Sequence, residues 1–103
     1  MKLLTKAIEA RFKSVGVQDG KGDQAVVIAK FFYPAGAATW YATEYDPTDR
    51  LFFGFVTGLG HDELGTFSLD ELEGFRGRFG LRIERDRFFS ECTVGDIREG
   101  RAR

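Results

Sequence analysis

The feature that most constrains the fold is an alternation of apolar and polar side chains, broken by short turns, between residues 24 and 67. The segments between the turns are rich in the β-branched and aromatic residues that favour strands. The predicted strands are 24–33, 37–45, 50–57 and 64–67. Because parallel neighbours need a crossover connection of a dozen or more residues, the short turns predict an antiparallel meander.

Two segments outside these strands have the apolar spacing of amphipathic helices. The first is predicted over residues 3–15 and is expected to end at Gly16. The second is predicted over residues 69–76. It follows Ser68, which has the spacing of a capping box with Glu71.

The rest of the chain completes an α+β prediction for one domain, residues 1–103. Residues 81–89 read as a further strand with Leu81 and Ile83 facing inward, and residues 93–103 as a weak helix or a frayed end. We expect an antiparallel sheet of four to five strands with both main helices packed mainly on one face. The second face is then partly open, as a binding surface or a homodimer contact.

Composition limits where the protein acts. Cys92 is the single cysteine, so the chain cannot form an internal disulfide. The start of the sequence lacks the apolar run of a secretory signal, and no segment approaches the roughly 20 apolar residues of a membrane span. We therefore expect a cytoplasmic protein without a membrane partner.

Arginine is concentrated towards the end of the chain. The net charge of the whole sequence is −1, yet residues 76–103 contain eight arginines and five acidic residues, a balance of +3. The arginines of segment 76–87 lie among Phe75, Phe79, Phe88 and Phe89, a combination suited to phosphate contact and base stacking. The sequence pI of about 5.8 is below that of a dedicated nucleic-acid-binding protein. Weak nucleic-acid binding is therefore an alternative hypothesis.

A second candidate surface is aromatic. Strict alternation along residues 37–45 places Trp40 on one face and both Tyr41 and Tyr45 on the other. Aromatic residues and arginine are enriched at protein interfaces. The candidate binding surface comprises Trp40, Tyr41, Tyr45, Arg82, Arg85 and Arg87.

Recognisable catalytic and metal-binding motifs do not occur in the sequence. One cysteine and one histidine are too few for a zinc site, and no glycine-framed nucleophile or phosphate loop is present. Acidic residues near predicted strand ends could instead converge into a carboxylate cluster. Its candidates are Glu44, Glu63, Glu84 and Asp86. An enzyme using this cluster is the second alternative, but the sequence favours a non-enzymatic role, with no cofactor and no metal.

Several short motifs give the chain a family resemblance. They are Leu3–Lys6, Lys30–Gly36, Thr39–Glu44, Glu63–Gly65, Ser68–Glu73, Arg76–Gly77 and Gly80–Asp86. Together they resemble the bacterial family called domain of unknown function 2958, over roughly residues 3–89. The resemblance implies a small protein of the kind often encoded on plasmids and integrated mobile elements. It implies no established activity.

These observations favour one function over the alternatives. The leading hypothesis is a non-enzymatic protein-interaction module of a mobile genetic element. Its expected partner is an unknown protein, and a second copy of the chain is another candidate.

Overall fold

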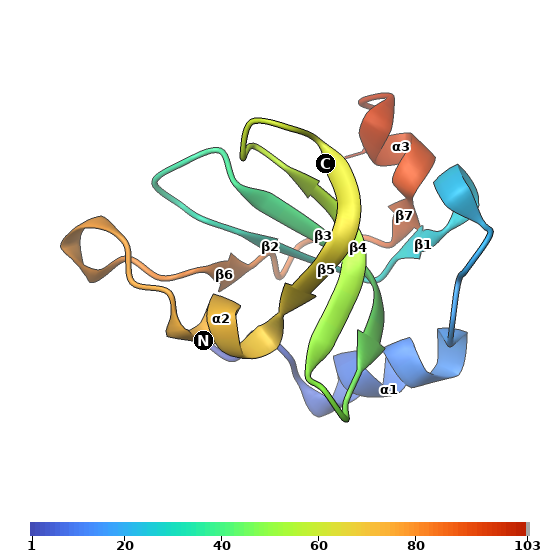
Figure 1. Ribbon diagram of the computed structural model, residues 1–103, viewed down its shortest axis with the longest axis horizontal. Helices are drawn as coiled ribbons and strands as arrows, with labels where there is room; N and C mark the ends of the chain where they lie inside the picture. Colours follow the sequence, from blue (N-terminus) through green and yellow to red (C-terminus); the bar gives the residue numbers. More distant parts are fainter. Residues whose placement is uncertain (103) are drawn as a thin grey trace.

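The computed structural model describes residues 1–102 and has an α+β architecture built on a five-stranded antiparallel sheet (Figure 1). The strands are β2 (Ala29–Phe32), β3 (Thr39–Asp46), β4 (Leu51–Thr57), β5 (Glu63–Ser68) and β6 (Glu84–Arg85). Their order in the sheet is β5–β4–β3–β2–β6, and every neighbouring pair is antiparallel. The predicted meander is confirmed, and β6 returns to extend it beside β2.

The N-terminal helix α1 (Lys6–Val15) is shorter than predicted. Thr5 takes the capping position, with extended backbone and a side-chain oxygen 3.2 Å from an N–H of the first turn. Leu3 and Leu4 therefore precede the helix, and both are buried in the core. The helix ends at Gly16, as predicted, where φ is +73°.

Helix α2 (Leu69–Gly74) is two residues shorter than the predicted 69–76. The Ser68 hydroxyl accepts a hydrogen bond from the Glu71 N–H at 3.1 Å, as the capping pattern predicts. The reciprocal bond from the Glu71 carboxylate is not among the hydrogen bonds of residues 1–102. The helix ends at Phe75, whose backbone is extended.

The predicted strand 24–33 is divided in two. β1 (Val26–Val27) pairs with β7 (Cys92–Thr93) in a separate two-stranded ribbon, whereas β2 belongs to the main sheet. The division lies at Ile28, which packs in the core on the α1 side, while Val27 packs in a second core. The prediction of one continuous strand over residues 24–33 was therefore wrong, because the chain passes from the β1–β7 ribbon to the main sheet between Val27 and Ile28.

The predicted strand 81–89 is also shorter in the structure, where only Glu84 and Arg85 are paired, with β2. Ile83 is buried, as expected. Leu81 is exposed instead of facing inward, because it lies in a projecting loop rather than on the sheet.

Helices α1 and α2 cover the first face of the sheet, as predicted. Phe52 lies at the centre of this core, with its ring 5.7 Å from that of Phe12, 5.2 Å from Phe31 and 5.4 Å from Phe67. Fully buried aromatic clusters of this kind are a large source of apolar stabilisation in a small protein.

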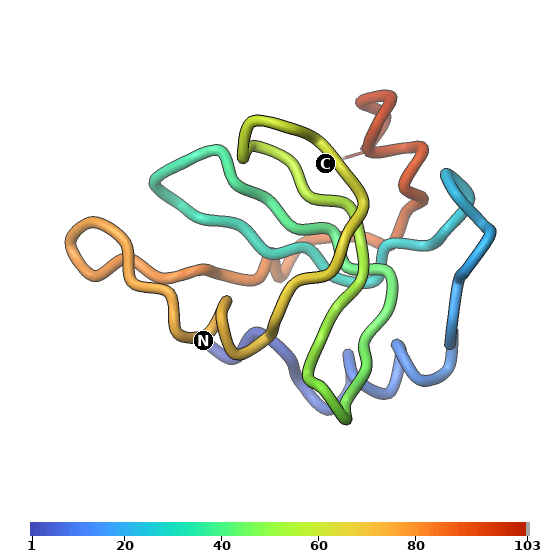
Figure 2. Tube along the Cα trace, viewed as in Figure 1, coloured from blue at the N-terminus to red at the C-terminus, as the bar shows by residue number. Residues whose placement is uncertain are grey.

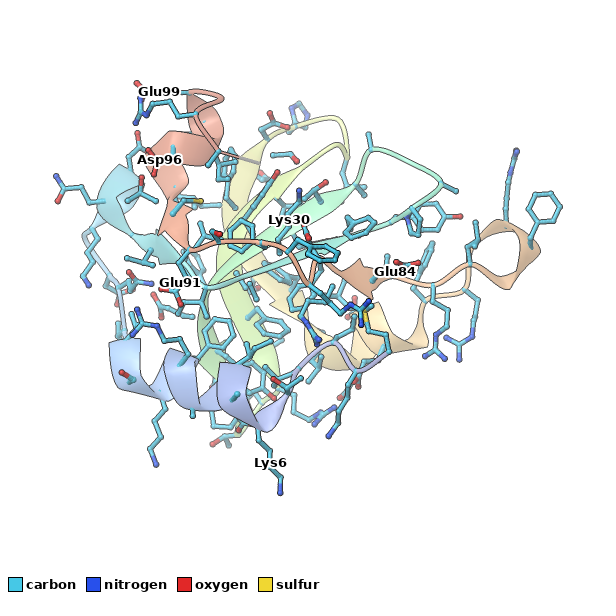
Figure 3. All side chains as sticks on the ribbon, turned by 180° about the vertical axis from the view of Figure 1, so that it is seen from behind. Lys6, Lys30, Glu84, Glu91, Asp96 and Glu99 are labelled. Carbon is cyan, nitrogen blue, oxygen red and sulfur yellow. The ribbon has the colours of Figure 1, made fainter. Side chains whose placement is uncertain are left out.

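The second face is more closed than predicted. The β1–β7 ribbon and helix α3 (Val94–Arg98) cover one side of it and form a smaller core with Phe55 (Figure 3). A complete capping box between Thr93 and Asp96 begins α3, so this part of the predicted terminal segment is helical. Two regions of this face stay open, one around Phe53 and Leu64 and one beside Lys30 and Thr39.

A β-bulge changes the alternation along β3. The pairing register with β4 shifts between Ala42 and Glu44, so Thr43 is the extra residue. As a result Tyr41 lies opposite Phe55 on the second face, whereas Tyr45 lies opposite Phe52 on the first. The prediction that the two tyrosines share a face was wrong.

No helix among the described residues is both long enough and apolar enough to span a membrane.

Candidate functional site: an apolar groove beside an exposed arm

The first face of the sheet carries an open groove where neither α1 nor α2 covers it. Its volume is about 380 Å³, which is within the range of small binding pockets. The lining is mostly apolar, with Ser68 and Glu71 as its polar members. The apolar side chains are Tyr33, Ala38, Trp40, Leu59, Phe67, Leu72, Phe75 and Ile83.

The sheet and α2 position the groove from two sides. Trp40 comes from the start of β3, opposite Phe31 and Val56, and is only half-buried. Leu72 and Phe75, at the end of α2, form one wall. The ring of Phe75 meets that of Tyr33 edge-on at 5.2 Å, which fixes the wall against the sheet.

On the opposite side of the groove, the position of Leu59 depends on the turn at Gly58. Gly58 begins the turn between β4 and β5 with φ of +82°, and a Cβ there would lie 2.1 Å from the carbonyl oxygen of Ala37. Only glycine allows this close approach of two backbones. The next residue, Leu59, is held beside the groove with 63% of its surface exposed.

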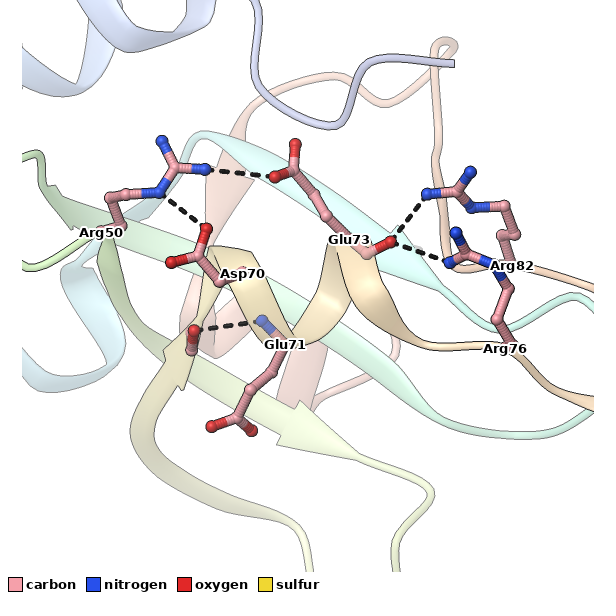
Figure 4. Close-up of polar contacts among 7 residues, drawn as sticks. Arg50, Asp70, Glu71, Glu73, Arg76 and Arg82 are labelled. Atoms are coloured by element: carbon pink, nitrogen blue, oxygen red, sulfur yellow. Dashed lines mark hydrogen bonds and ion pairs between the residues drawn. The ribbon is translucent and has the colours of Figure 1, made fainter.

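Two of the acidic side chains on α2 form ion pairs, and Glu71 does not within the described residues (Figure 4). Arg50 pairs with Asp70 at 2.8 Å and with Glu73 at 3.1 Å. Glu71 points away from this network, and within residues 1–102 its carboxylate makes no ion pair (Figure 4). The groove therefore has an apolar interior and one unneutralised negative charge at its rim.

Residues 75–83, which we call the arm, continue from α2 and project beyond the sheet at one end of the molecule (Figure 2). At its base, Arg76 and Arg82 donate to the carbonyl oxygen of Glu73 at 3.1 and 2.7 Å (Figure 4). These cations neutralise the negative end of the α2 dipole. The base of the arm is thus fixed to α2.

The tip of the arm carries an aromatic side chain in solvent. Phe79 has 97% of its surface exposed and a φ of +58°, which is uncommon outside glycine. Gly77 lies next to Tyr33, where a Cβ would be 2.0 Å from the phenolic oxygen. That oxygen accepts a hydrogen bond from the Arg78 N–H at 3.1 Å, so the tip has a defined position.

The structure separates the predicted binding residues. Trp40 opens into the groove, but Tyr41 is 8% exposed and packs in the second core, so its predicted exposure was wrong. Burial raises the pKa of Tyr41. Tyr45 packs its ring against Phe12 and Phe52 at 6.1 and 4.8 Å, and burial also raises its pKa.

Two of the three predicted arginines have structural contacts. Arg82 caps α2, and Arg85 donates to the carbonyl oxygens of Lys2 and Leu3, which ties the N-terminal segment to β6. Arg87 is exposed beside a broad hollow of about 530 Å³ on the second face. None of these three arginines lines the groove into which Trp40 opens.

That hollow is a weaker candidate than the groove. Its charged residues include Lys30, Glu84, Asp86 and Arg87, which are of both signs (Figure 3). Lys30 already contacts Asp86 at 3.6 Å, so part of this charge is neutralised internally. The hollow lacks the single dominant charge of a selective site, and its lining mixes apolar residues with charges of both signs.

The predicted carboxylate cluster does not form. Glu63 and Glu84 belong to β5 and β6, which are the opposite edges of the sheet. Glu44 accepts a hydrogen bond from the Gln18 N–H at 3.0 Å, and Asp86 faces Lys30. Residues 1–102 contain no group of three or more acids, histidines or cysteines that could hold a metal ion. The expectation that these four acids converge into a cluster was therefore wrong.

The sequence reasoning placed Leu59 in no candidate surface, and it considered Phe75 and Phe79 only as core residues or as base-stacking partners of the arginines. Leu59 lies between two glycines, and Phe79 lies between Gly77 and Gly80. A large apolar residue inside a glycine turn has little chance of reaching the core, because turns run over the surface. This pattern could have marked two of the three as exposed.

Fold and groove together define a small α+β protein with an apolar groove and a projecting arm. The chain belongs to the family described as "Protein of unknown function (DUF2958)", whose model matches residues 3–94. No curated protein and no solved structure matches the chain.

Proposed function

We propose that this chain is a non-enzymatic protein-interaction module that binds an apolar side chain of a partner protein in the groove. The observation that carries the proposal is the open groove itself, with Trp40 in it and Leu59 and Phe75 exposed beside it. Monomeric proteins rarely leave large contiguous apolar surface in water unless it serves binding. The dispersed carboxylates favour this role over an enzyme.

The dimensions and charge of the groove indicate which kind of side chain it binds. A volume of about 380 Å³ suits one large anchor, such as a phenylalanine or leucine side chain, with a short backbone segment beside it. Burying such an anchor contributes about 1.5–3 kcal/mol. Glu71 at the rim favours a basic residue next to the anchor.

The setting of this function is part of the same proposal. A role in the cytoplasm, as part of a bacterial mobile genetic element, is supported by the family resemblance of the sequence motifs. The partner is identified by chemistry alone, as a protein segment with an apolar anchor and an adjacent positive charge.

The experiment uses Trp40 as its reporter, because it is the single tryptophan of the chain. A phage-displayed random peptide library is selected against the full chain, and enriched peptides are titrated while Trp40 emission is recorded. We expect enriched peptides to contain an aromatic or leucine anchor with an adjacent lysine or arginine, and to shift the emission.

A matched pair of variants tests the location of binding. Leu59→Asp places a charge beside the groove and should weaken peptide binding at least about tenfold. Phe88→Asp places the same charge on another exposed apolar residue, in the other hollow, and should leave binding unchanged. Equal binding to the parent and Leu59→Asp proteins would show that the groove is not the docking site.

A further inference from the structure

The chain contains both a strongly exposed aromatic side chain and an open apolar groove. Phe79 at the tip of the arm is 97% exposed, and the groove beside the base of the arm is open. The two features lie on one molecule, but the arm projects beyond the sheet (Figure 1), and Phe79 at its tip does not line the groove. A second copy of the chain can match them.

The arm is built to hold Phe79 in place. The Gly77 N–H donates to the carbonyl oxygen of Leu81 at 2.7 Å, and the Gly80 N–H donates back to that of Gly77 at 3.1 Å. Together with the bond from Arg78 to Tyr33, these contacts close the tip into a tight loop. Phe79 adopts a left-handed backbone there, a conformation that costs strain in a residue with a Cβ.

The charges of the tip and of the groove are complementary. Arg78 adjoins Phe79, and within the described residues its guanidinium makes no hydrogen bond or ion pair. Glu71 lines the groove, and its carboxylate is equally without an ionic partner in that part of the chain. The groove thus offers an apolar space with an adjacent negative charge, and the tip offers an aromatic ring with an adjacent positive charge.

We propose that two copies of this chain form a two-fold dimer in which Phe79 of each copy enters the groove of the other and Arg78 pairs there with Glu71. The inference rests on the proposed docking function of the groove and names its occupant. It commits to a second copy because the required anchor and the required charge both occur at the tip of this chain's own arm.

The placement of the groove fits this symmetry. Phe75 and Ile83, at the two ends of the arm, both line the groove, so the groove lies at the arm's base. A two-fold axis through the middle of the arm therefore places each tip over the partner's base, with the arms side by side and antiparallel. The contact is isologous and closes after two copies.

The size of the contact predicts its strength. Each buried aromatic removes about 150–250 Å² from water, and its groove loses a similar area. Two such contacts bury about 600–1,000 Å², below the roughly 1,200 Å² at which stable interfaces begin. We therefore expect a weak dimer that dissociates on dilution.

Sedimentation velocity of the full chain, from about 1 μM to about 1 mM, measures this equilibrium. The parent chain should shift from monomer to dimer within that range. Phe79→Ala should weaken dimerisation at least about tenfold, whereas Phe88→Ala, which removes an equally exposed ring outside the arm, should not change it.

Charge exchange tests the specific pairing. Arg78→Glu and Glu71→Arg should each weaken the dimer, and the variant that combines them should recover most of the affinity, because the pair is restored with reversed signs. Both side chains are exposed, so folding is expected to survive, and far-ultraviolet circular dichroism checks it.

Three results would overturn the inference. The first is a parent chain that stays monomeric at every concentration. The second is a dimer that Phe79→Ala or Leu59→Asp leaves intact. The third is a Phe79→Ala variant that loses affinity for a labelled single-stranded oligonucleotide while its dimerisation is unchanged, which would assign the arm to nucleic acid. If selected peptides still bind the groove in any of these cases, the proposed function stands and only the self-association is wrong.

Discussion

Tyr41 and Tyr45 lie four residues apart on the same strand and face opposite sides of the sheet. Regular alternation would place them together, but the bulge at Thr43 inserts one residue and reverses the pattern. The Thr43 hydroxyl donates to the carbonyl oxygen of Phe53 at 3.0 Å, which fixes the irregularity. The bulge makes both tyrosines structural, each in a different core.

Tyr41→Ala should therefore destabilise the protein without affecting the groove. The side chain is buried against Phe55 on the second face, and its truncation is expected to cost about 3 kcal/mol. Urea unfolding measures the loss. Groove peptides should still shift Trp40 emission below the unfolding transition, and a selective loss of that shift would contradict the assignment.

Gly54 and Gly65 are register partners on β4 and β5, and they offer a matched pair of substitutions. A Cβ on Gly54 would lie 1.9 Å from the carbonyl oxygen of Tyr41, whereas none of the described atoms lies within 4 Å of one on Gly65. Gly54→Ala should lower the free energy of unfolding by about 2–4 kcal/mol, and Gly65→Ala by less than about 0.5 kcal/mol. Equal effects in urea unfolding would argue against the close approach of β3 and β4.

Phe79→Gly should leave stability within about 1 kcal/mol of the parent chain. Glycine removes the strain of a positive φ, and its greater freedom in the unfolded chain offsets the gain. Thermal unfolding of a dilute, monomeric sample checks this. A fall of several kcal/mol would mean that Phe79 has a core role, contrary to its exposure.

The contact between Arg11 and Glu91 predicts a pH dependence. Arg11 Nη2 lies 2.8 Å from Glu91 Oε1 and joins α1 to the segment before β7. The hydrogen bond from Arg11 lowers the pKa of Glu91. The stabilisation is thus present above the unfolded-state pKa of glutamate and is lost as the pH falls through the lower pKa of the folded state.

Glu91→Gln should therefore be less stable than the parent near neutral pH, and the difference should shrink in acid. The effect is small and salt-sensitive, because both side chains are partly exposed to solvent. Urea midpoints at several pH values, with and without added salt, measure it. A stability difference that grows as the pH falls would show that the contact is not ionic.

Local sequence patterns were sufficient for the main strands and helices and their order, but not for the separate β1–β7 ribbon. Alternation with short turns predicted the antiparallel meander, and glycine stops with a capping serine located the two main helices to within a few residues. These signals act between neighbours in the chain, where backbone geometry and side-chain period are nearly independent of the rest of the fold.

The candidate site was predicted less well. Of the proposed surface, Trp40 alone opens into the groove, whereas Tyr41 is buried and Arg82 and Arg85 hold backbone carbonyls. The bulge at Thr43 has no reliable sequence signal, since threonine is also common in regular strands. A single extra residue was enough to move a predicted surface tyrosine into a core.

The sequence by itself determined the fold class and the succession of the main strands and helices, because these follow from local periodicity and turn chemistry, and its motifs carried the family resemblance. Tertiary structure decided that β1 and β7 leave the main sheet, that α3 covers part of the second face and that Leu59 and Phe75 meet around Trp40. Such contacts join residues far apart in the chain. Their formation depends on how whole layers pack and on which surfaces they leave uncovered.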